Sequence, residues 1–168
     1  MRMDAWHASW IWGGEEESPR NEWRCFRRSF VPAGNARDAK VRVTADSRYV
    51  LYVNGARVGR GPVRSWPFET AYDEYEIGHL LTPGAEAVIA VLVTHYGLAT
   101  FQYLRGRGGL LLELDGCFGE EGRIGTDHHW KTTLHSAFHR GAARISCQLG
   151  FTETYDARPL DKGWTAPG

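Results

Sequence analysis

The chain has 168 residues and a formal net charge of zero, because its 20 basic side chains balance its 20 acidic ones. Proteins that bind nucleic acid usually carry a basic excess that attracts phosphates, so this balance argues against a nucleic-acid partner. Hydrophobic residues make up 42% of the chain and charged residues 24%, which is typical of a globular domain with its own core.

The cysteines and the N-terminus together predict a cytoplasmic location. Cys25, Cys117 and Cys147 are odd in number and scattered, which does not fit a disulfide framework and suits a reducing compartment. We expect Cys25 and Cys147 to be small core residues. Residues 1–4 open no apolar signal region. The longest strongly apolar run, residues 87–93, is too short to cross a bilayer, so we expect no membrane partner.

The first predicted strand follows an irregular arm at the N-terminus, residues 1–22. Residues 23–31 are then predicted to form an early strand, with Cys25 or Phe26 and Phe30 turned inward.

A β-hairpin and a buried strand are predicted in the middle of the chain. Residues 41–44 alternate valine with polar residues, and residues 49–53 place Tyr, Leu and Val on one face of the next strand. Asn54-Gly55 follows, and both residues tolerate the positive φ of a type I′ turn. Residues 87–93 are apolar on both faces and rich in β-branched side chains, which predicts a central strand.

The last third of the chain is less uniform. Residues 110–114 and 144–149 are candidate strands, whereas residues 127–139 fit a helix about as well as a strand, because large apolar side chains recur there at every fourth position. Residues 159–168 are rich in proline and are predicted to form a linker. Many short strands, punctuated by 20 glycines and 7 prolines, indicate an all-β sandwich or barrel.

Several motifs, in this order and spacing, resemble one known family. They are Val43–Tyr49, Tyr52–Gly55, Val58–Ser65, Tyr72–Ile77, His95–Gly97, Gly106–Leu111, Thr126-Asp127 with Trp130, Glu153–Arg158 and Gly163-Trp164. The chain is similar, from Trp10 to Trp164, to the N-terminal β-sandwich domain of bacterial α-L-rhamnosidases, glycoside hydrolase family 78. This resemblance implies a jelly-roll β-sandwich of the galactose-binding-domain-like type, which we place at residues 23–158.

The resemblance also implies an accessory function. In that family catalysis belongs to a separate α-helical toroid downstream, so we expect this chain to hold no catalytic residue, metal or cofactor. Its expected partner is its own downstream catalytic domain, which it would pack on and support, with residues 159–168 as the linker toward it. The residues predicted at that interface are two tryptophans of the arm and three residues of the exit motif: Trp10, Trp12, Tyr155, Asp156 and Arg158. Trp6 is a further candidate for an exposed apolar patch there.

A carbohydrate site is a second hypothesis. Sugars are bound by aromatic faces and by planar polar groups that contact vicinal hydroxyls. Arg60, Arg64, Trp66 and Asp73 supply such groups after the hairpin, and Tyr96 and Arg107 form a second candidate group beside a glycine-rich loop. A plainer alternative is that Trp66 and Pro67 cover the edge of the sandwich, while Arg60 and Arg64 pair with local acids and Arg107 is buried and paired. A third is that these side chains line the neighbouring catalytic domain.

Two pairs of carboxylates fit structural roles better than a catalytic one. Glu74 and Glu76 would share one face of a strand, but they fit the solvated face of an edge strand, and Glu153 and Asp156 fit an anchor beside Arg158 better than a catalytic pair.

On a helix, His128, His135 and His139 would share one face and could bind a transition metal; on a strand they would be scattered. No serine lies in a Gly-x-Ser-x-Gly elbow. The alternatives left open are therefore a stand-alone carbohydrate-binding module or lectin that binds a rhamnose-containing glycan, and a small metalloprotein.

Overall fold

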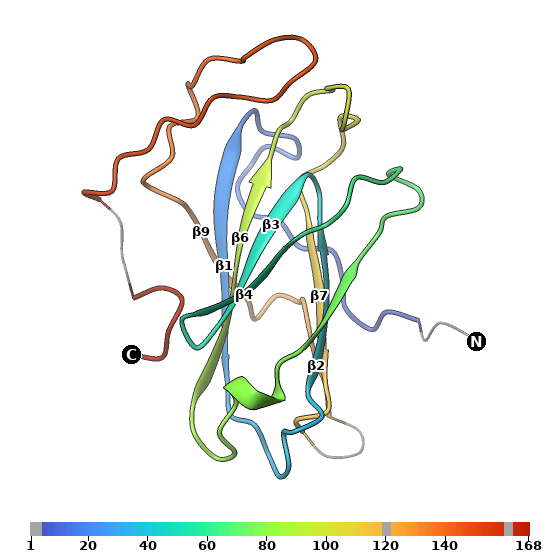
Figure 1. Ribbon diagram of the computed structural model, residues 1–168, viewed down its shortest axis with the longest axis vertical. Helices are drawn as coiled ribbons and strands as arrows, with labels where there is room; N and C mark the ends of the chain where they lie inside the picture. The colour runs from blue at the N-terminus through green and yellow to red at the C-terminus, as the bar shows by residue number, and fades with distance from the viewer. Residues whose placement is uncertain (1–4, 119–121, 160–162) are drawn as a thin grey trace.

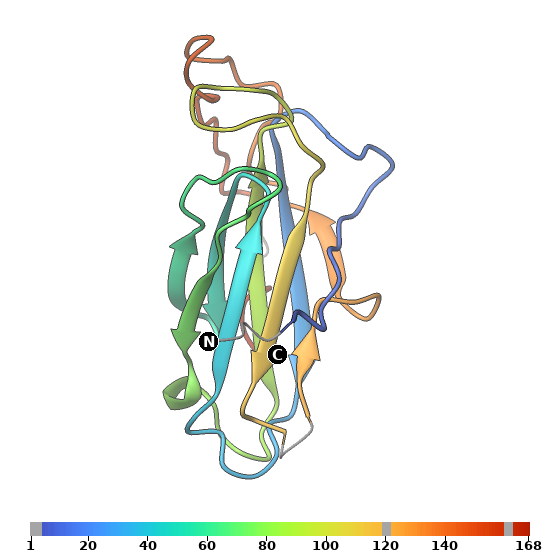
Figure 2. The same ribbon diagram turned by 90° about the vertical axis from the view of Figure 1, so that its right-hand side faces the viewer.

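Two antiparallel β-sheets packed face to face make up the molecule (Figures 1 and 2). The computed structural model describes residues 5–118, 122–159 and 163–168. Within them the strands are β1 (Glu22–Phe30), β2 (Lys40–Ala45), β3 (Arg48–Val53), β4 (Ala56–Gly61), β5 (Asp73–Glu76), β6 (Ala87–His95), β7 (Leu110–Asp115), β8 (Ile124–Gly125) and β9 (Lys131–Leu134), and one short 3-10 turn covers Gly78–Leu80. The strand orders are β4-β3-β6-β1-β9 and β5-β2-β7-β8. The predicted all-β jelly-roll sandwich is confirmed.

Strand β6 is the centre of the larger sheet. It pairs with β1 on one side and β3 on the other, and all of its residues are buried. Because side chains alternate along a strand, Ile89 and Val91 point into the core between the sheets, together with Phe26 and Leu51 of the neighbouring strands. The prediction of a buried central strand at residues 87–93, and of an inward-facing Phe26 in β1, is therefore confirmed.

The turn between β3 and β4 is formed as the sequence predicts. Asn54 and Gly55 have φ angles of 49° and 81°, the positive values of a type I′ turn. The Asn54 side chain also accepts a hydrogen bond from the Val88 amide and donates one to the Leu80 carbonyl, both at 2.8 Å. The asparagine thus fixes both the turn and its contact with the start of β6.

Two predictions about the last third of the chain are decided by the structure. Residues 127–139 contain strand β9 and no helix, so the strand alternative is correct; Trp130 is buried just before it and donates to the Gly125 carbonyl at 3.0 Å. Residues 144–149 do not form a strand, because only Arg144 pairs there, in an isolated bridge to Phe151. Cys147 lies exposed in this loop, so its assignment to the core was wrong, whereas Cys25 is buried.

Residues 135–158, which we call the excursion, pack on the larger sheet without adding a long strand to it. The end of the chain does the same. The excursion closes on itself through backbone bonds such as Thr152 N to Ala143 O at 2.8 Å. After residues 160–162, which lie outside the described part of the predicted linker, the Gly55 amide donates to Thr165 O at 2.8 Å, and the Trp164 ring packs edge-on against Tyr52. No helix of the described residues is long and apolar enough to cross a membrane.

Candidate ligand site

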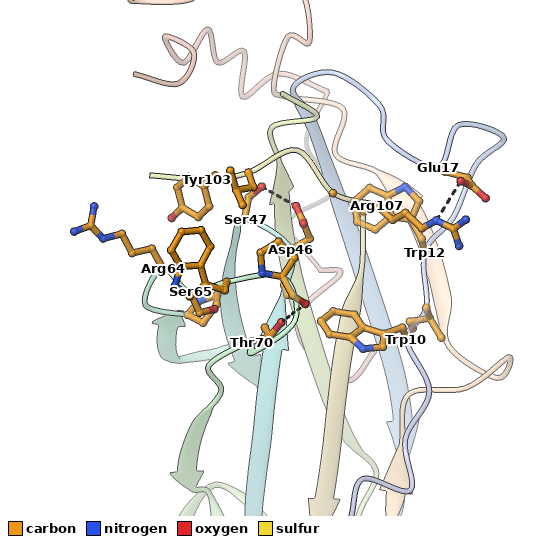
Figure 3. A pocket seen from close by; sticks show the side chains of 18 of the residues that line it. Trp10, Trp12, Glu17, Asp46, Ser47, Arg64, Ser65, Thr70, Tyr103 and Arg107 are labelled. Atoms are coloured by element: carbon orange, nitrogen blue, oxygen red, sulfur yellow. Dashed lines mark hydrogen bonds and ion pairs between the residues drawn. The ribbon is translucent and has the colours of Figure 1, made fainter. Parts of the chain in front are cut away.

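A pocket of about 640 Å³ opens at one end of the sandwich, between the arm and the loops that follow β4 and β6 (Figure 3). Its lining comes from residues 10–17 of the arm, residues 45–47 between β2 and β3, residues 62–70 after β4, and residues 103–108 before β7. Loops held by a rigid sheet scaffold are where binding residues are usually placed.

The glycine-rich run before β7 provides the seat for the tryptophans of this pocket. A Cβ atom added to Gly108 would lie 2.4 Å from Cε2 of Trp12, and one added to Gly109 would lie 2.6 Å from Cε3 of Trp10. Both rings therefore lie directly against the backbone, which only glycine allows. Trp12 is half-buried and also packs on Phe26, whereas Trp10 is 50% exposed and presents its ring at the pocket.

The arm that carries these tryptophans is fixed to the smaller sheet. Ile11 and Leu110 exchange backbone hydrogen bonds at 3.0 and 2.9 Å. Nearer the start of the arm, the amides of His7 and Ala8 donate to the fully buried carboxylate of Glu113 in β7, at 2.7 and 3.1 Å. This carboxylate also forms an ion pair with Arg42. Burial alone would raise the pKa of Glu113, but these hydrogen bonds and the guanidinium outweigh it and hold the pKa below its usual value.

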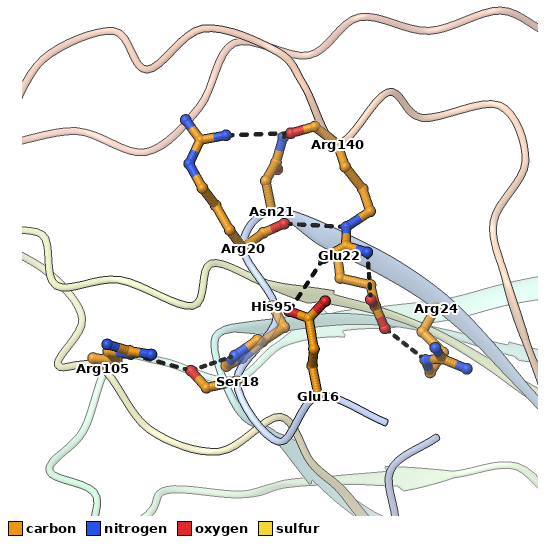
Figure 4. A network of polar contacts seen from close by, with 9 residues as sticks. All are labelled: Glu16, Ser18, Arg20, Asn21, Glu22, Arg24, His95, Arg105 and Arg140. Carbon is orange, nitrogen blue, oxygen red and sulfur yellow. Dashed lines mark hydrogen bonds and ion pairs between the residues drawn. The ribbon is translucent and has the colours of Figure 1, made fainter. Parts of the chain in front are cut away.

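A buried histidine orients an acid at the floor of the pocket. Nδ1 of His95 lies 2.7 Å from Oδ1 of Asp46, and the Ser47 hydroxyl donates to the same oxygen at 2.9 Å. Nε2 of His95 lies 3.4 Å from the Ser18 hydroxyl (Figure 4). Ser18, His95 and Asp46 are thus connected in the same order as the members of a Ser-His-Asp hydrolytic triad. Ser18, however, is not among the residues that line the pocket. We therefore assign this series to holding Asp46 and the arm in place.

Three of the six side chains proposed from the sequence to contact sugar lie together in this pocket: Arg64, Trp66 and Arg107. Trp66 is 59% exposed and stacks on Phe68, so it does not cover the edge of the sandwich as the plainer alternative required. Arg107 is exposed and pairs with Glu17 at 3.2 Å, so the expected pairing is present and the expected burial is not.

The other three are placed elsewhere. Arg60 is on β4 and outside the pocket lining, and within the described residues neither Arg60 nor Arg64 forms an ion pair, so the proposed pairing with local acids is not found. Asp73 accepts a hydrogen bond from Tyr49 between the two sheets, and burial together with this contact raises the pKa of the tyrosine. The Tyr96 ring packs against Tyr103.

The structure also places the residues predicted at a domain interface in different regions of the molecule. Trp10 and Trp12 belong to the pocket, as described above. Tyr155 packs on Phe138, which stacks on Trp23 of β1. Asp156 and Arg158 form an exposed ion pair with each other at 2.5 Å, the anchoring contact predicted from the sequence; the arginine lowers the pKa of the Asp156 carboxyl.

The helix on which the metal hypothesis depended is not formed, so the three histidines do not share a helical face. His128 is exposed before β9, and His135 is buried against Phe138 after it. In the part of the chain that the structure describes, no group of three potential ligands is close enough to hold a metal ion.

A second feature of this end of the molecule was not anticipated from the sequence. Phe101, Ile145 and Leu149 are 77%, 58% and 47% exposed. They come from two loops that bind each other, because Phe101 N donates to Gln148 O at 3.1 Å and the Arg144 guanidinium donates to Ala99 O at 2.7 Å. We call these three side chains the apolar tip; their loops lie at the same end of the sandwich as residues 103–108 (Figure 2), a segment that lines the pocket.

Comparison with known proteins identifies the family. The model of the alpha-L-rhamnosidase N-terminal domain matches residues 34–168. The chain belongs to this family. The family resemblance noted in the sequence is therefore confirmed, and the chain represents an N-terminal domain of these enzymes.

The relatives are much longer proteins. The crystal structure of a GH78 family rhamnosidase of Bacillus sp. GL1 has 52% sequence identity and a TM-score of 0.92, over 99% of this chain and 17% of that one. An alpha-L-rhamnosidase of Streptomyces avermitilis is 28% identical over 149 residues, which are 82% of this chain and 14% of that protein. A lectin of Pleurotus ostreatus, at 20% identity, a TM-score of 0.52 and coverage of 96% of this chain and 46% of that one, shares the fold alone.

Proposed function

We propose that the chain is a non-catalytic accessory domain of an α-L-rhamnosidase-type glycoside hydrolase, and that it packs on and supports a downstream α-helical toroid catalytic domain. Membership of the family and the small share of the relatives that the chain spans support this proposal. The observation that carries it is the apolar tip. Large apolar side chains exposed on two loops that hydrogen-bond to each other are typical of a surface that another protein unit covers.

The acidic residues also favour a non-catalytic role. Glu74 and Glu76 lie exposed on the edge strand β5, at 3.3 and 3.8 Å from the Lys40 ammonium group. Asp156 is held by Arg158. Glu74, Glu76 and Asp156 therefore each have a local charge partner, and neither pair lines the pocket.

The test is made on the native protein. We expect its mass to be several times 18.9 kDa, and we expect Phe101→Ser to lower its unfolding temperature while leaving that of the 168-residue chain unchanged. Val31→Ser is the control, because Val31 is also an exposed apolar residue, at 54% against 77% for Phe101, and it directly follows the last residue of β1. A native mass of 18.9 kDa, or equal effects of the two substitutions, would contradict the proposal.

A second candidate function is carbohydrate binding, and the pocket favours it. Trp10 and Trp66 offer exposed rings in one cavity with the polar side chains of Asp46 and Ser47. We expect saturable, weak binding of a free sugar that Trp66→Ala abolishes without loss of the fold. Titrations that give no heat with L-rhamnose or with galacturonan fragments would count against this candidate.

We also propose a cytoplasmic location for the protein. Cys25 and Cys117 are buried, Cys117 within the apolar core, and an odd, scattered set of three cysteines suits a reducing compartment. Fractionation of the source cells tests it: recovery of the protein outside the cytoplasmic fraction would contradict the proposal.

A further inference from the structure

One arginine joins the two loops that carry the apolar tip. The guanidinium of Arg144 donates to the backbone carbonyls of Ala99 at 2.7 Å, Cys147 at 2.5 Å and Leu149 at 3.0 Å. Ala99 belongs to the loop of Phe101, and the other two acceptors belong to the loop of Leu149 itself. A positive charge therefore lies among the apolar side chains that, under the proposed accessory function, another protein unit covers.

Part of this guanidinium is open to solvent. The group has five N–H donors, and its three carbonyl contacts are made by Nε and Nη2. Within the described residues Nη1 makes no hydrogen bond, and the only buried side-chain nitrogen atoms without a partner are on Trp12 and Arg28. Nη1 of Arg144 is consequently accessible, with two N–H groups that a partner can engage.

The charge of Arg144 is not neutralised by the residues that the structure describes. Its three acceptors are neutral carbonyls, and it has no ion pair among those residues. Residues 97–106 and 139–152 contain three arginines and no aspartate or glutamate. Arg140 is neutralised from outside these segments, because it lies 3.7 Å from Glu16 and 3.4 Å from Glu22. The two loops of the apolar tip thus carry excess positive charge.

Covering the apolar tip would remove water from Arg144. A charged group that leaves water loses hydration free energy, which neutral carbonyls do not fully replace, and an opposite charge offsets this cost. Within a protein the ordinary side chains that supply a negative charge are those of aspartate and glutamate, and a carboxylate accepts strong, charge-assisted hydrogen bonds from a guanidinium. A wholly apolar partner surface would leave the charge buried and unpaired.

We propose that the unit of the native protein that covers the apolar tip presents an aspartate or a glutamate to Nη1 of Arg144, within a contact that is otherwise apolar. The inference rests on the proposed accessory function and adds the chemistry of the partner surface. Phe101, Ile145 and Leu149 supply the apolar area of the contact, and Arg144 fixes its register, because a single buried ion pair forms in only one alignment of the two surfaces.

The experiment is a zero-length cross-link in the native protein. Arg144→Lys keeps the positive charge and replaces the guanidinium with an amine. A water-soluble carbodiimide condenses such an amine with a carboxylate that contacts it, and mass spectrometry of the peptides locates the amide. We expect a link from position 144 to an aspartate or glutamate outside these 168 residues. Lys40, whose Nζ lies 3.3 Å from Oε1 of Glu74, provides an internal reference link.

Two further variants support the assignment. Gln148→Lys places an amine on the same loop at an exposed position, and we expect it to reach the same acidic residue. This variant decides the question if Arg144→Lys disturbs the loops whose carbonyls the arginine binds. Arg60→Lys is the control, because Arg60 is exposed on β4 and has no ion pair among the described residues; we expect no link from it to a residue outside the chain.

The outcomes separate this inference from the function on which it rests. The inference is overturned if positions 144 and 148 link only to Glu153 of the same chain, or only between two copies of the protein. It is equally overturned if neither forms a link while the Lys40–Glu74 reference is present. Should Phe101→Ser still lower the unfolding temperature of the native protein, only the acidic partner is wrong; if that substitution also has no effect, the accessory function falls with it.

Discussion

The two sheets differ in their use of apolar residues from the end of the sandwich that carries the pocket and the apolar tip, which we call the loop end. In the sheets the alternation of side chains buries them, so that β6 has no exposed residue and Phe26 is fully enclosed. At the loop end, Trp66 and the apolar tip stand in solvent on loops that hydrogen bonds hold in shape. Burial of the sheets accounts for the stability of the fold. We expect the exposed set to add little to it and the loop end to be the functional region.

The largest expected effect comes from removing a core side chain. Phe26→Ala should lower the free energy of unfolding by about 3–5 kcal/mol, because the residue is fully buried and leaves a cavity. Trp66→Ala, a larger deletion at an exposed position, should change it by less than about 0.5 kcal/mol. Urea unfolding of both variants measures the contrast. Similar losses in the two would show that the loop end is part of the stabilising core.

A smaller effect is expected where the two regions meet. Gly108→Ala would place a Cβ 2.4 Å from the Trp12 ring and should cost about 1–3 kcal/mol through overpacking. Gly141→Ala is the control, since nothing lies within 4 Å of the added atom. Chemical denaturation of the two variants should separate them clearly. If Gly108→Ala were as stable as its control, Trp12 would not be seated on the glycine run.

The pH dependence of stability tests the packing of the excursion. Burial lowers the pKa of His135 in the folded protein, so the unfolded chain binds this proton more tightly. The contribution of His135 is therefore complete above about pH 6.5, the usual value for an unfolded histidine, and is lost as the pH falls below it. His135→Gln should flatten the decline in stability between about pH 7 and pH 5.

The comparison for this measurement is an exposed histidine. His79→Gln should leave the pH profile unchanged, because His79 lies at the surface. Unfolding midpoints measured across the pH range would decide between them; a wild-type profile without decline toward pH 5 would contradict the burial of His135.

The smallest effect is expected at the edge of the smaller sheet. Glu74→Gln removes one exposed partner of Lys40 and should change the unfolding free energy by less than about 1 kcal/mol. Thermal unfolding at low and high salt measures it. A loss well above that value would mean that this charge pair is structurally important and is not simply a solvated face.

The sequence was sufficient where the rule is local. Asn54-Gly55 predicts its turn because both residues tolerate positive φ. Residues 87–93 predict a central strand because the apolar run is short, rich in β-branched residues and preceded by Pro83-Gly84. The same reasoning wrongly predicted a strand at residues 144–149. Ile145 and Leu149 are apolar but exposed, and a hydrophobic pattern cannot distinguish a buried strand from a loop that presents apolar side chains to a partner.

The site was only partly predictable for a different reason. Trp66 and Arg107 were found because aromatic and arginine side chains are conspicuous near turns. Asp46 and His95 are 49 positions apart in the sequence, and only the pairing of β3 with β6 brings them together. Such contacts follow from topology, and the single sequence contains no local signal for them.

Hydrogen exchange on the native protein and on the 168-residue chain alone tests the accessory role most directly. The account predicts that amides in residues 99–103 and 144–150, the loops of the apolar tip, exchange more slowly in the native protein than in the chain alone, while those of β6 are equally protected in both. Equal exchange of the tip loops in the two proteins would contradict it, because the apolar tip would then be exposed in both.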